Sequence, residues 1–334
     1  MILRLPLLLA AATVAVSAGE IRLRLVAESG PPLAGARATV VYTTPEHGAE
    51  QVRAGSADPA GLFVSHGTAI GRVLVRAEAP GFYPVQLELP PADEPRELRL
   101  ALRDVRRPIA LHVRRLRVEW DAMEPPPPPG TVEVQTYELD LELGEPLPPR
   151  GRGRRGDVRV RVEREFLGWK FPPAVMAELR APQAGVALGE ADARFLHGRW
   201  RARFELAVPE PGGGWSEVSG DYLPSCALAM PHGAPERGYT PAWTWTCRTG
   251  ERCGEDLRQP ARGYFLRVRP VRHGSGAVVA WHHAKLSSGV QLDARGDLGL
   301  TVHFNPVAGD RNLEFDPARN LAAPGVPDDT TRQP

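Results

Sequence analysis

Short runs of alternating apolar and polar residues recur along the whole chain. Such alternation puts every second side chain on one face of an extended segment, so it predicts half-buried β-strands. Proline (35 residues) and glycine (34 residues) separate the runs without a fixed period, and both residue types interrupt regular structure. We therefore predict a mostly β protein. The clearest runs are residues 21–25, 158–162, 200–206 and 298–304.

The first part of the chain predicts a compact β-sandwich. Residues 20–103 hold about six or seven runs at roughly ten-residue spacing, a pattern typical of sandwiches. The intervening segments have turn chemistry. In residues 58–61, for example, Asp comes first, Pro second and Gly fourth, the order that a β-turn prefers.

Three of these segments carry a family resemblance. Gly30-Pro31-Pro32-Leu33-Ala34-Gly35-Ala36, residues 56–63 and residues 77–82 resemble the carboxypeptidase regulatory-like domain. The resemblance covers about 80 residues, and it departs from the family at Ala57, where Thr is usual. It implies a transthyretin-like (prealbumin-type) β-sandwich at residues 19–103 and a non-catalytic accessory module of a secreted or surface protein.

The rest of the chain predicts a second, larger β-rich domain. Residues 104–130 are expected to hold a transition strand at 109–118, whose apolar positions shift midway, and a Pro-rich linker. Pro125 to Pro129 favour extended polyproline II structure. We expect the β-rich domain at 131–316, with a short helix within 172–188. Residues 317–334 have few apolar groups and are expected to be disordered.

The N-terminus predicts export. A short segment with one positive charge (residues 1–4) precedes an apolar run, and small residues end at Ala18, which is the order of a signal peptide. The run is about 12 residues long, whereas a membrane-spanning helix needs about 20. We predict cleavage after Ala18 and a secreted or periplasmic product without a membrane anchor, since the first cysteine is Cys226.

Charge excludes a general affinity for nucleic acid. The chain has 41 basic and 40 acidic residues, and removing residues 1–18 deletes one Arg and no acid, so the mature chain would be neutral. A neutral chain has no overall attraction to phosphate polymers. Lys170 and Lys285 are the only lysines, which we attribute to genomic bias. We interpret the Arg- and Gly-rich segment 150–156 as a solvated loop.

Two aromatic residues are the candidate ligand-binding site. Trp243 and Trp245 stand at positions i and i+2, so they share one face of a strand. They are candidates for a platform that stacks on sugar rings. Core packing is the competing interpretation, because aromatic side chains contribute large burial energy.

Oxygen-bearing residues near the C-terminus form a candidate calcium site. Asp310, Asn312, Glu314 and Asp316 alternate as ligands do at the start of a calcium loop. An EF-hand also needs glycine at the sixth position and glutamate at the twelfth, where this chain has Phe315 and Leu321. An edge strand with the acids facing outward is the competing interpretation. We therefore predict no metal and no cofactor.

The cysteines and histidines suggest a disulfide and no catalytic centre. Export makes a bond between Cys247 and Cys253 possible, with Cys226 as an alternative partner. The adjacent His282 and His283 would face opposite sides of a strand. No serine-nucleophile elbow or phosphate-binding loop is present in the sequence.

The sequence thus predicts a non-enzymatic exported protein with a structural or binding role outside the cytoplasm. Its partner would be an unidentified extracellular protein or glycan. Two alternatives remain: a carbohydrate-binding protein that uses the tryptophan pair, and a hydrolase of extracellular polymer with its site in residues 131–316.

Overall fold

A computed structural model describes residues 18–43, 50–68, 72–90, 95–120, 127–172, 174–175, 198–218, 220–250 and 263–322, with the backbone alone at 18, 68 and 287–289. The chain forms two compact units, unit 1 (Met1–Val105) and unit 2 (Arg106–Pro334). Strands make up almost all regular structure in these ranges, which confirms the mostly β prediction. None of the described helical segments has the length and hydropathy needed to cross a membrane.

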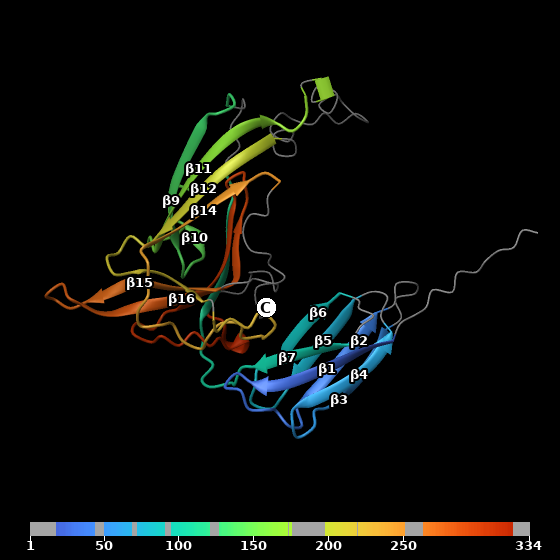
Figure 1. The fold of residues 1–334 in the computed structure, drawn as a ribbon. Helices are drawn as coiled ribbons and strands as arrows, with labels where there is room; N and C mark the ends of the chain where they lie inside the picture. Colours follow the sequence, from blue (N-terminus) through green and yellow to red (C-terminus); the bar gives the residue numbers. More distant parts are fainter. Residues whose placement is uncertain are drawn as a thin grey trace, which may run out of the picture. The chain divides into compact units, whose positions relative to one another are not determined.

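Unit 1 is a β-sandwich of two sheets (Figure 1). One sheet has the order β4-β1-β7, in which β1 runs antiparallel to β4 and parallel to β7. The other has the antiparallel order β3-β2-β5-β6. The strands are β1 (Ala18–Ala27), β2 (Arg37–Thr43), β3 (Glu50–Ser56), β4 (Leu62–Thr68), β5 (Val73–Glu78), β6 (Val85–Leu89) and β7 (Arg96–Leu102).

The core of unit 1 follows from the alternation in its strands. Every second residue of β2 is buried, and Tyr42 near its end is 1% exposed. The Tyr42 hydroxyl donates a 2.9 Å hydrogen bond to Ser65 Oγ on β4, which joins the two sheets. A Cβ atom at Gly67 would lie 2.4 Å from the Tyr42 ring, so this position has no room for a side chain.

Unit 2 is built from two five-stranded sheets (Figure 1). The β11 sheet has the order β10-β9-β11-β12-β14, and the β16 sheet has the order β13-β15-β16-β17-β8. Their strands are β8 (His112–Val118), β9 (Val132–Asp140), β10 (Glu145–Pro146), β11 (Val158–Trp169), β12 (Gly198–Ala207), β13 (Gly214–Val218), β14 (Ala242–Arg248), β15 (Gly263–Arg272), β16 (Val278–Leu292) and β17 (Leu298–Asn305).

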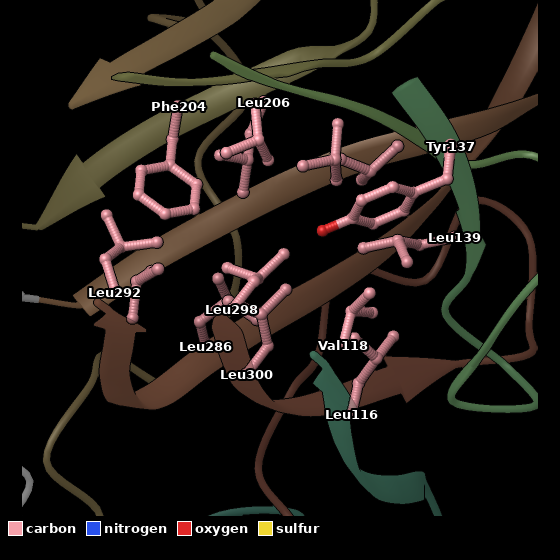
Figure 2. Close-up of a cluster of buried hydrophobic side chains, with 14 of the residues drawn as sticks. Leu116, Val118, Tyr137, Leu139, Phe204, Leu206, Leu286, Leu292, Leu298 and Leu300 are labelled. Carbon is pink, nitrogen blue, oxygen red and sulfur yellow. The ribbon is translucent and has the colours of Figure 1, made fainter. Parts of the chain in front are cut away.

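Apolar side chains from both sheets of unit 2 form one core. Tyr137, Phe204 and Leu206 come from the β11 sheet, and they meet Leu286 and Leu300 of the β16 sheet (Figure 2). We call this side of the β16 sheet its inner face. The opposite side, its outer face, has a second apolar cluster that includes residues of the 219–240 and 306–322 segments.

The start and end of unit 2 differ from the boundaries that the sequence suggests. Strand β8, where the sequence predicts a transition strand, pairs with β17 and is an edge strand of the β16 sheet. The chain past residue 316 continues into a 3₁₀ turn (Pro317–Arg319), and Leu321 N–H donates a 2.9 Å hydrogen bond to the Leu111 carbonyl. Residues up to 322 are therefore ordered against β8, contrary to the expected disorder from residue 317.

Several predictions fall outside the described residues. These are the signal peptide up to Ser17, almost all of the expected 172–188 helix, and residues 323–334. Strand β1 begins at Ala18, the residue after which we predict cleavage.

Candidate functional site

The two candidate tryptophans lie on one face of strand β14, as their spacing predicts. Both are half-buried and pack against the inner core. Their ring centroids are 5.1 Å apart with planes inclined by 29°, and Trp215 stacks on Trp243 at 6.4 Å. Trp243 and Trp245 thus cover one another's faces instead of lying side by side as an open platform. This geometry favours core packing over sugar stacking.

The four calcium candidates are engaged in other contacts. Both carboxylate oxygens of Asp310 accept 2.8 Å hydrogen bonds from Arg107 Nη2, and Glu314 accepts from the backbone N–H groups of Arg106 and Arg107. Asn312 donates to the Arg107 carbonyl at 2.7 Å. These contacts attach the C-terminal segment to the first residues of unit 2.

The fourth calcium candidate serves the turn that follows it. Asp316 accepts hydrogen bonds from Ala318 N–H and from Arg319 Nε, and the Arg319 hydrogen bond is the main cause that lowers the Asp316 pKa. The alternating oxygen atoms therefore bind N–H groups and guanidinium groups of the protein. This arrangement gives them a structural role that the alternation alone did not indicate.

The cysteines do not form a disulfide within the described ranges. Cys226 and Cys247 are both buried and are not bonded to each other, so the alternative pairing of these two residues is wrong. Cys253 lies outside the described residues. A bond to Cys253 stays a prediction.

The Arg- and Gly-rich segment 150–156 follows the edge of the β11 sheet. Arg150 donates to Gln135 at 2.8 Å, and Arg152 pairs with Glu145 at 2.6 Å. The backbone N–H groups of Arg154 and Arg155 both donate to Asp140. The segment is held in place by local contacts.

A buried ion network that the sequence did not reveal joins the two sheets of unit 2. Arg269 donates to both oxygens of Asp157 at 2.7 and 2.8 Å, to Asp140 at 2.8 Å and to Glu142. Its guanidinium carbon lies 4.6 Å from the centroid of the Phe304 ring. Arg269 has φ of 49°, a left-handed conformation that is uncommon for a residue other than glycine.

The charges in this network depend on one another. Burial raises the pKa of Asp157, while the Arg269 hydrogen bond acts in the opposite direction. Burial also acts to raise the pKa of Asp140, but N–H donors, first that of Arg154, and the Arg269 charge lower it overall. The carboxylates of Asp157, Asp140 and Glu142 all accept hydrogen bonds from Arg269. The network therefore links the two sheets and leaves none of these carboxylates available for chemistry.

The outer face of the β16 sheet buries titratable side chains. His283 and Lys285 on β16 stand opposite Asn305 and His303 on β17. Each of these four residues is 5% exposed or less. Burial, followed by the charges of Arg267 and Arg311, lowers the pKa of His283 to about 4. Burial and the nearby Lys285 hold the pKa of His303 well below its ordinary value.

A pocket of about 260 Å³ lies where strand ends of both sheets of unit 2 meet. Strand β11 leads into it, β12 starts in it, β14 ends at it, and the β16–β17 turn (residues 292–295) completes it. Leu292 and Ala294 supply apolar surface. The other side chains that carry its chemistry are Lys170, Trp200, Arg248, Thr249, Asp293 and Arg295.

Hydrogen bonds hold the pocket wall in place. Thr249 Oγ1 accepts a 2.8 Å hydrogen bond from Trp200 N–H, and Thr249 N–H donates to the Trp200 carbonyl at 2.9 Å. In the facing turn, Arg295 donates to Asp293 through its backbone N–H, Nε and Nη2 at 2.6 to 2.8 Å. Neither side of the pocket depends on a ligand for its shape.

The floor of the pocket rests on a buried cation. Arg164 is 5% exposed and lies between the rings of Trp120 and Trp200, 4.3 and 4.5 Å from their centroids. It pairs with Glu133 at 2.6 Å and donates to the Arg295 carbonyl at 3.1 Å. Arg164 thereby connects the Trp200 floor to the turn that bears Arg295.

Sequence reasoning missed this pocket because its parts are distant in the chain. Lys170 and Arg295 are separated by more than a hundred residues, and neither belongs to a recognisable motif. The alternation at residues 200–206 predicts a half-buried strand, and Trp200 lies on its buried side, 3% exposed. No local signal marked it as the floor of a pocket.

No family model matches the chain, and no curated protein matches it. The resemblance to the carboxypeptidase regulatory-like domain therefore stays a prediction.

Some solved structures are similar to the chain at low identity. A streptococcal ancillary pilin is 13% identical, with a TM-score of 0.23, and the match covers 48% of this chain and 57% of the pilin chain. A "putative carbohydrate binding protein" from Bacteroides uniformis is 10% identical, with a TM-score of 0.20, covering 87% and 98% of the two chains. A DUF3823 family protein from Parabacteroides merdae is 6% identical, with a TM-score of 0.21, covering 86% and 98%. Scores this low carry no argument about function.

Proposed function

We propose that the protein is an exported, non-enzymatic binding protein that recognises a glycan outside the cytoplasm through the pocket of unit 2. The single observation that carries the proposal is the make-up of this pocket. An aromatic floor, apolar patches and a few convergent polar groups are the usual ingredients of a site for a small organic ligand. Export rests on the predicted signal peptide, residues 1–18.

Unit 1 has an accessory role in this proposal. Its two-sheet sandwich is the fold class that the resemblance to the carboxypeptidase regulatory-like domain implies. The resemblance implies a module without catalytic residues. Unit 1 would thus support or space unit 2 at the cell surface.

The carboxylate inventory of the pocket favours binding over hydrolysis. Most glycoside hydrolases use two carboxyl groups that flank the bond to be cleaved. The described lining has one carboxylate, that of Asp293, and both its oxygens accept hydrogen bonds from Arg295. A hydrolase acting on extracellular polymer is therefore the second candidate.

Affinity electrophoresis of the mature chain (residues 19–334) tests the proposal. The gels would contain a neutral or an acidic polysaccharide, and we expect at least one class to retard the protein. An assay for new reducing ends runs in parallel with the same polymers. Retardation by none of them, or release of reducing ends, would overturn the proposal.

A further inference from the structure

We infer that strand β14 pairs with β14 of a second copy of the chain, so that two β11 sheets join into one continuous sheet. This association goes beyond the proposed function and does not depend on it, because it uses the edge of a strand and not the pocket. Three features carry it: the free edge of β14, the protection of the other strand edges, and a register that suits self-pairing.

Strand β14 lies at one edge of the β11 sheet and has backbone groups to spare (Figure 1). It pairs with β12 along its whole length without a break in register. Thr249, just past the strand, donates its N–H to the Trp200 carbonyl, so the odd-numbered residues of β14 bond to β12. The N–H and C=O groups of Thr244 and Thr246 therefore point away from β12, and no described segment pairs with them.

The exposed edge of β14 lacks the usual protection against pairing. Natural proteins protect strand edges with charged residues, prolines, bulges or a covering segment. Residues 242–247 contain no charged residue and no proline, and their pairing with β12 shows no bulge. Threonine and tryptophan, which make up most of the strand, also favour extended structure. An edge with these properties is a template for another strand.

Three other edge strands of unit 2 are protected. Strand β8 contains Arg114, Arg115 and Arg117, and residues 320–321 cover part of its edge through hydrogen bonds. Strand β13 is bridged to Thr240. Strand β10 has two residues, of which the second is a proline.

Strand β9 also has an edge stretch, at residues 132–136, because β10 pairs only with its far end. This stretch contains Glu133, and Arg150 donates a 2.8 Å hydrogen bond to Gln135. Charged side chains thus accompany the β9 edge, whereas residues 242–247 of β14 carry none. We therefore assign the contact to β14 and use β9 as the control.

The sequence of β14 is suited to antiparallel pairing with itself. When the pairing is centred on Trp245, Thr244 of each copy stands opposite Thr246 of the other. Residues that point outward then meet each other, as an antiparallel ladder requires, and threonine pairs across strands are stabilising. Arg248 of each copy stands opposite Ala242, so this register brings no like charges face to face.

The tryptophans add apolar contact to the same register. Trp243 and Trp245 are half-buried, so part of each ring remains accessible at the edge of the sheet. The Trp245 residues of the two copies would be directly opposite each other, and aromatic pairs across strands are favourable. The same strand serves both copies, so a two-fold axis relates them and the association closes at a dimer.

Sedimentation velocity of the mature chain (residues 19–334) over a series of concentrations tests the inference. We expect an equilibrium between monomer and dimer. The double variant Thr244→Lys with Thr246→Lys places lysine opposite lysine twice in this register. Like charges in opposite positions are destabilising, so we expect the dissociation constant of the dimer to rise about tenfold or more.

Two further variants check the register and the edge. Thr244→Lys with Thr246→Glu places lysine opposite glutamate twice, so it should keep a dissociation constant within about threefold of wild type. Thr136→Lys is the matched control, since Thr136 is an exposed threonine on β9, at the other edge of the same sheet. It should leave the dimer unchanged. Urea midpoints close to that of wild type verify that the variants fold.

Each other outcome overturns the inference. A monomer at every concentration shows that β14 does not pair, and growth into assemblies larger than a dimer contradicts a closed two-fold contact. Equal dissociation constants for the two double variants contradict the register. A dimer that Thr136→Lys weakens, but neither double variant does, places the contact on β9. None of these results bears on glycan binding, which affinity electrophoresis tests separately.

Discussion

The two faces of the β16 sheet bury different kinds of residue. On the inner face, Leu286 and Leu300 pack against the apolar side of the β11 sheet. On the outer face, the same strands bury His283, Lys285 and His303. The difference lies in what covers each face, since a second sheet covers one and connecting segments cover the other.

A sheet and a loop that cover a face of another sheet offer it different hydrogen-bonding groups. The backbone N–H and C=O groups of a sheet are used in its own ladder, so only side chains remain to contact a facing sheet. A loop has backbone groups left over. Asn305 illustrates this point, because its amide donates to the carbonyls of Asp310 and Asn312, and its oxygen accepts from Val307 N–H at 2.8 Å.

The largest expected effect tests the inner face. Phe204→Ala removes a fully buried ring, and such truncations cost about 3–5 kcal/mol of unfolding free energy. Urea denaturation followed by tryptophan fluorescence measures it. All seven tryptophans belong to unit 2, so the signal reports on that unit alone. A loss below about 1 kcal/mol would contradict a tightly packed core.

A smaller effect is expected on the outer face. Asn305→Ala deletes three hydrogen bonds of a side chain that is 0% exposed, and their backbone partners are part-buried. We expect a loss of about 2–3 kcal/mol, since each hydrogen bond contributes about 0.5–1.5 kcal/mol net. The same denaturation measures it. If Asn305→Ala leaves the free energy of unfolding unchanged, the proposed difference between a face covered by a sheet and a face covered by connecting segments is contradicted.

Acid should weaken the outer face selectively. Burial lowers the pKa of His283 to about 4, against about 6.5 in an unfolded chain, so the folded protein keeps this histidine neutral. Stability is complete above pH 6.5 and falls as the pH drops from about 6.5 towards 4, because the unfolded chain binds the proton first. We expect His283 to account for about 1–3 kcal/mol of that loss.

Variants assign the acid sensitivity. His283→Gln should flatten the dependence of the unfolding midpoint on pH between 7 and 4, because its side chain does not titrate. Phe204→Ala should lower stability while it keeps the wild-type pH dependence. If both variants keep the wild-type slope, His283 is not the source.

The smallest effect concerns the exposed rim of the outer face. Asp310→Asn weakens the pair with Arg107, whose side chain is 66% exposed, and exposed pairs contribute about 0–1 kcal/mol. We also expect no calorimetric heat at millimolar calcium, because the oxygens of Asp310 and Glu314 already accept hydrogen bonds. Heat that Asp310→Asn abolishes would restore the calcium interpretation.

Strand β8 shows what the local pattern of apolar residues predicts and what it leaves open. The sequence suggested a shift in its apolar positions midway. In the structure the strand alternates without a break: Val113 faces the outer cluster, and Leu116 and Val118 face the inner core. The two ends of the strand bury opposite faces, because different parts of unit 2 cover them. The local sequence shows the alternation, but it does not show which face is covered.

The sequence by itself determined the β class, most strand positions and a β-sandwich in the first part of the chain. It could do so because alternation is a local property, set by the two-residue repeat of an extended chain. The tertiary structure decided what covers each face, and hence that His283 is buried and that the oxygens of Asp310 to Asp316 bind the protein's own donors. It also decided the pocket, because Lys170, Trp200, Arg248 and Arg295 come together only when both sheets of unit 2 have formed and packed.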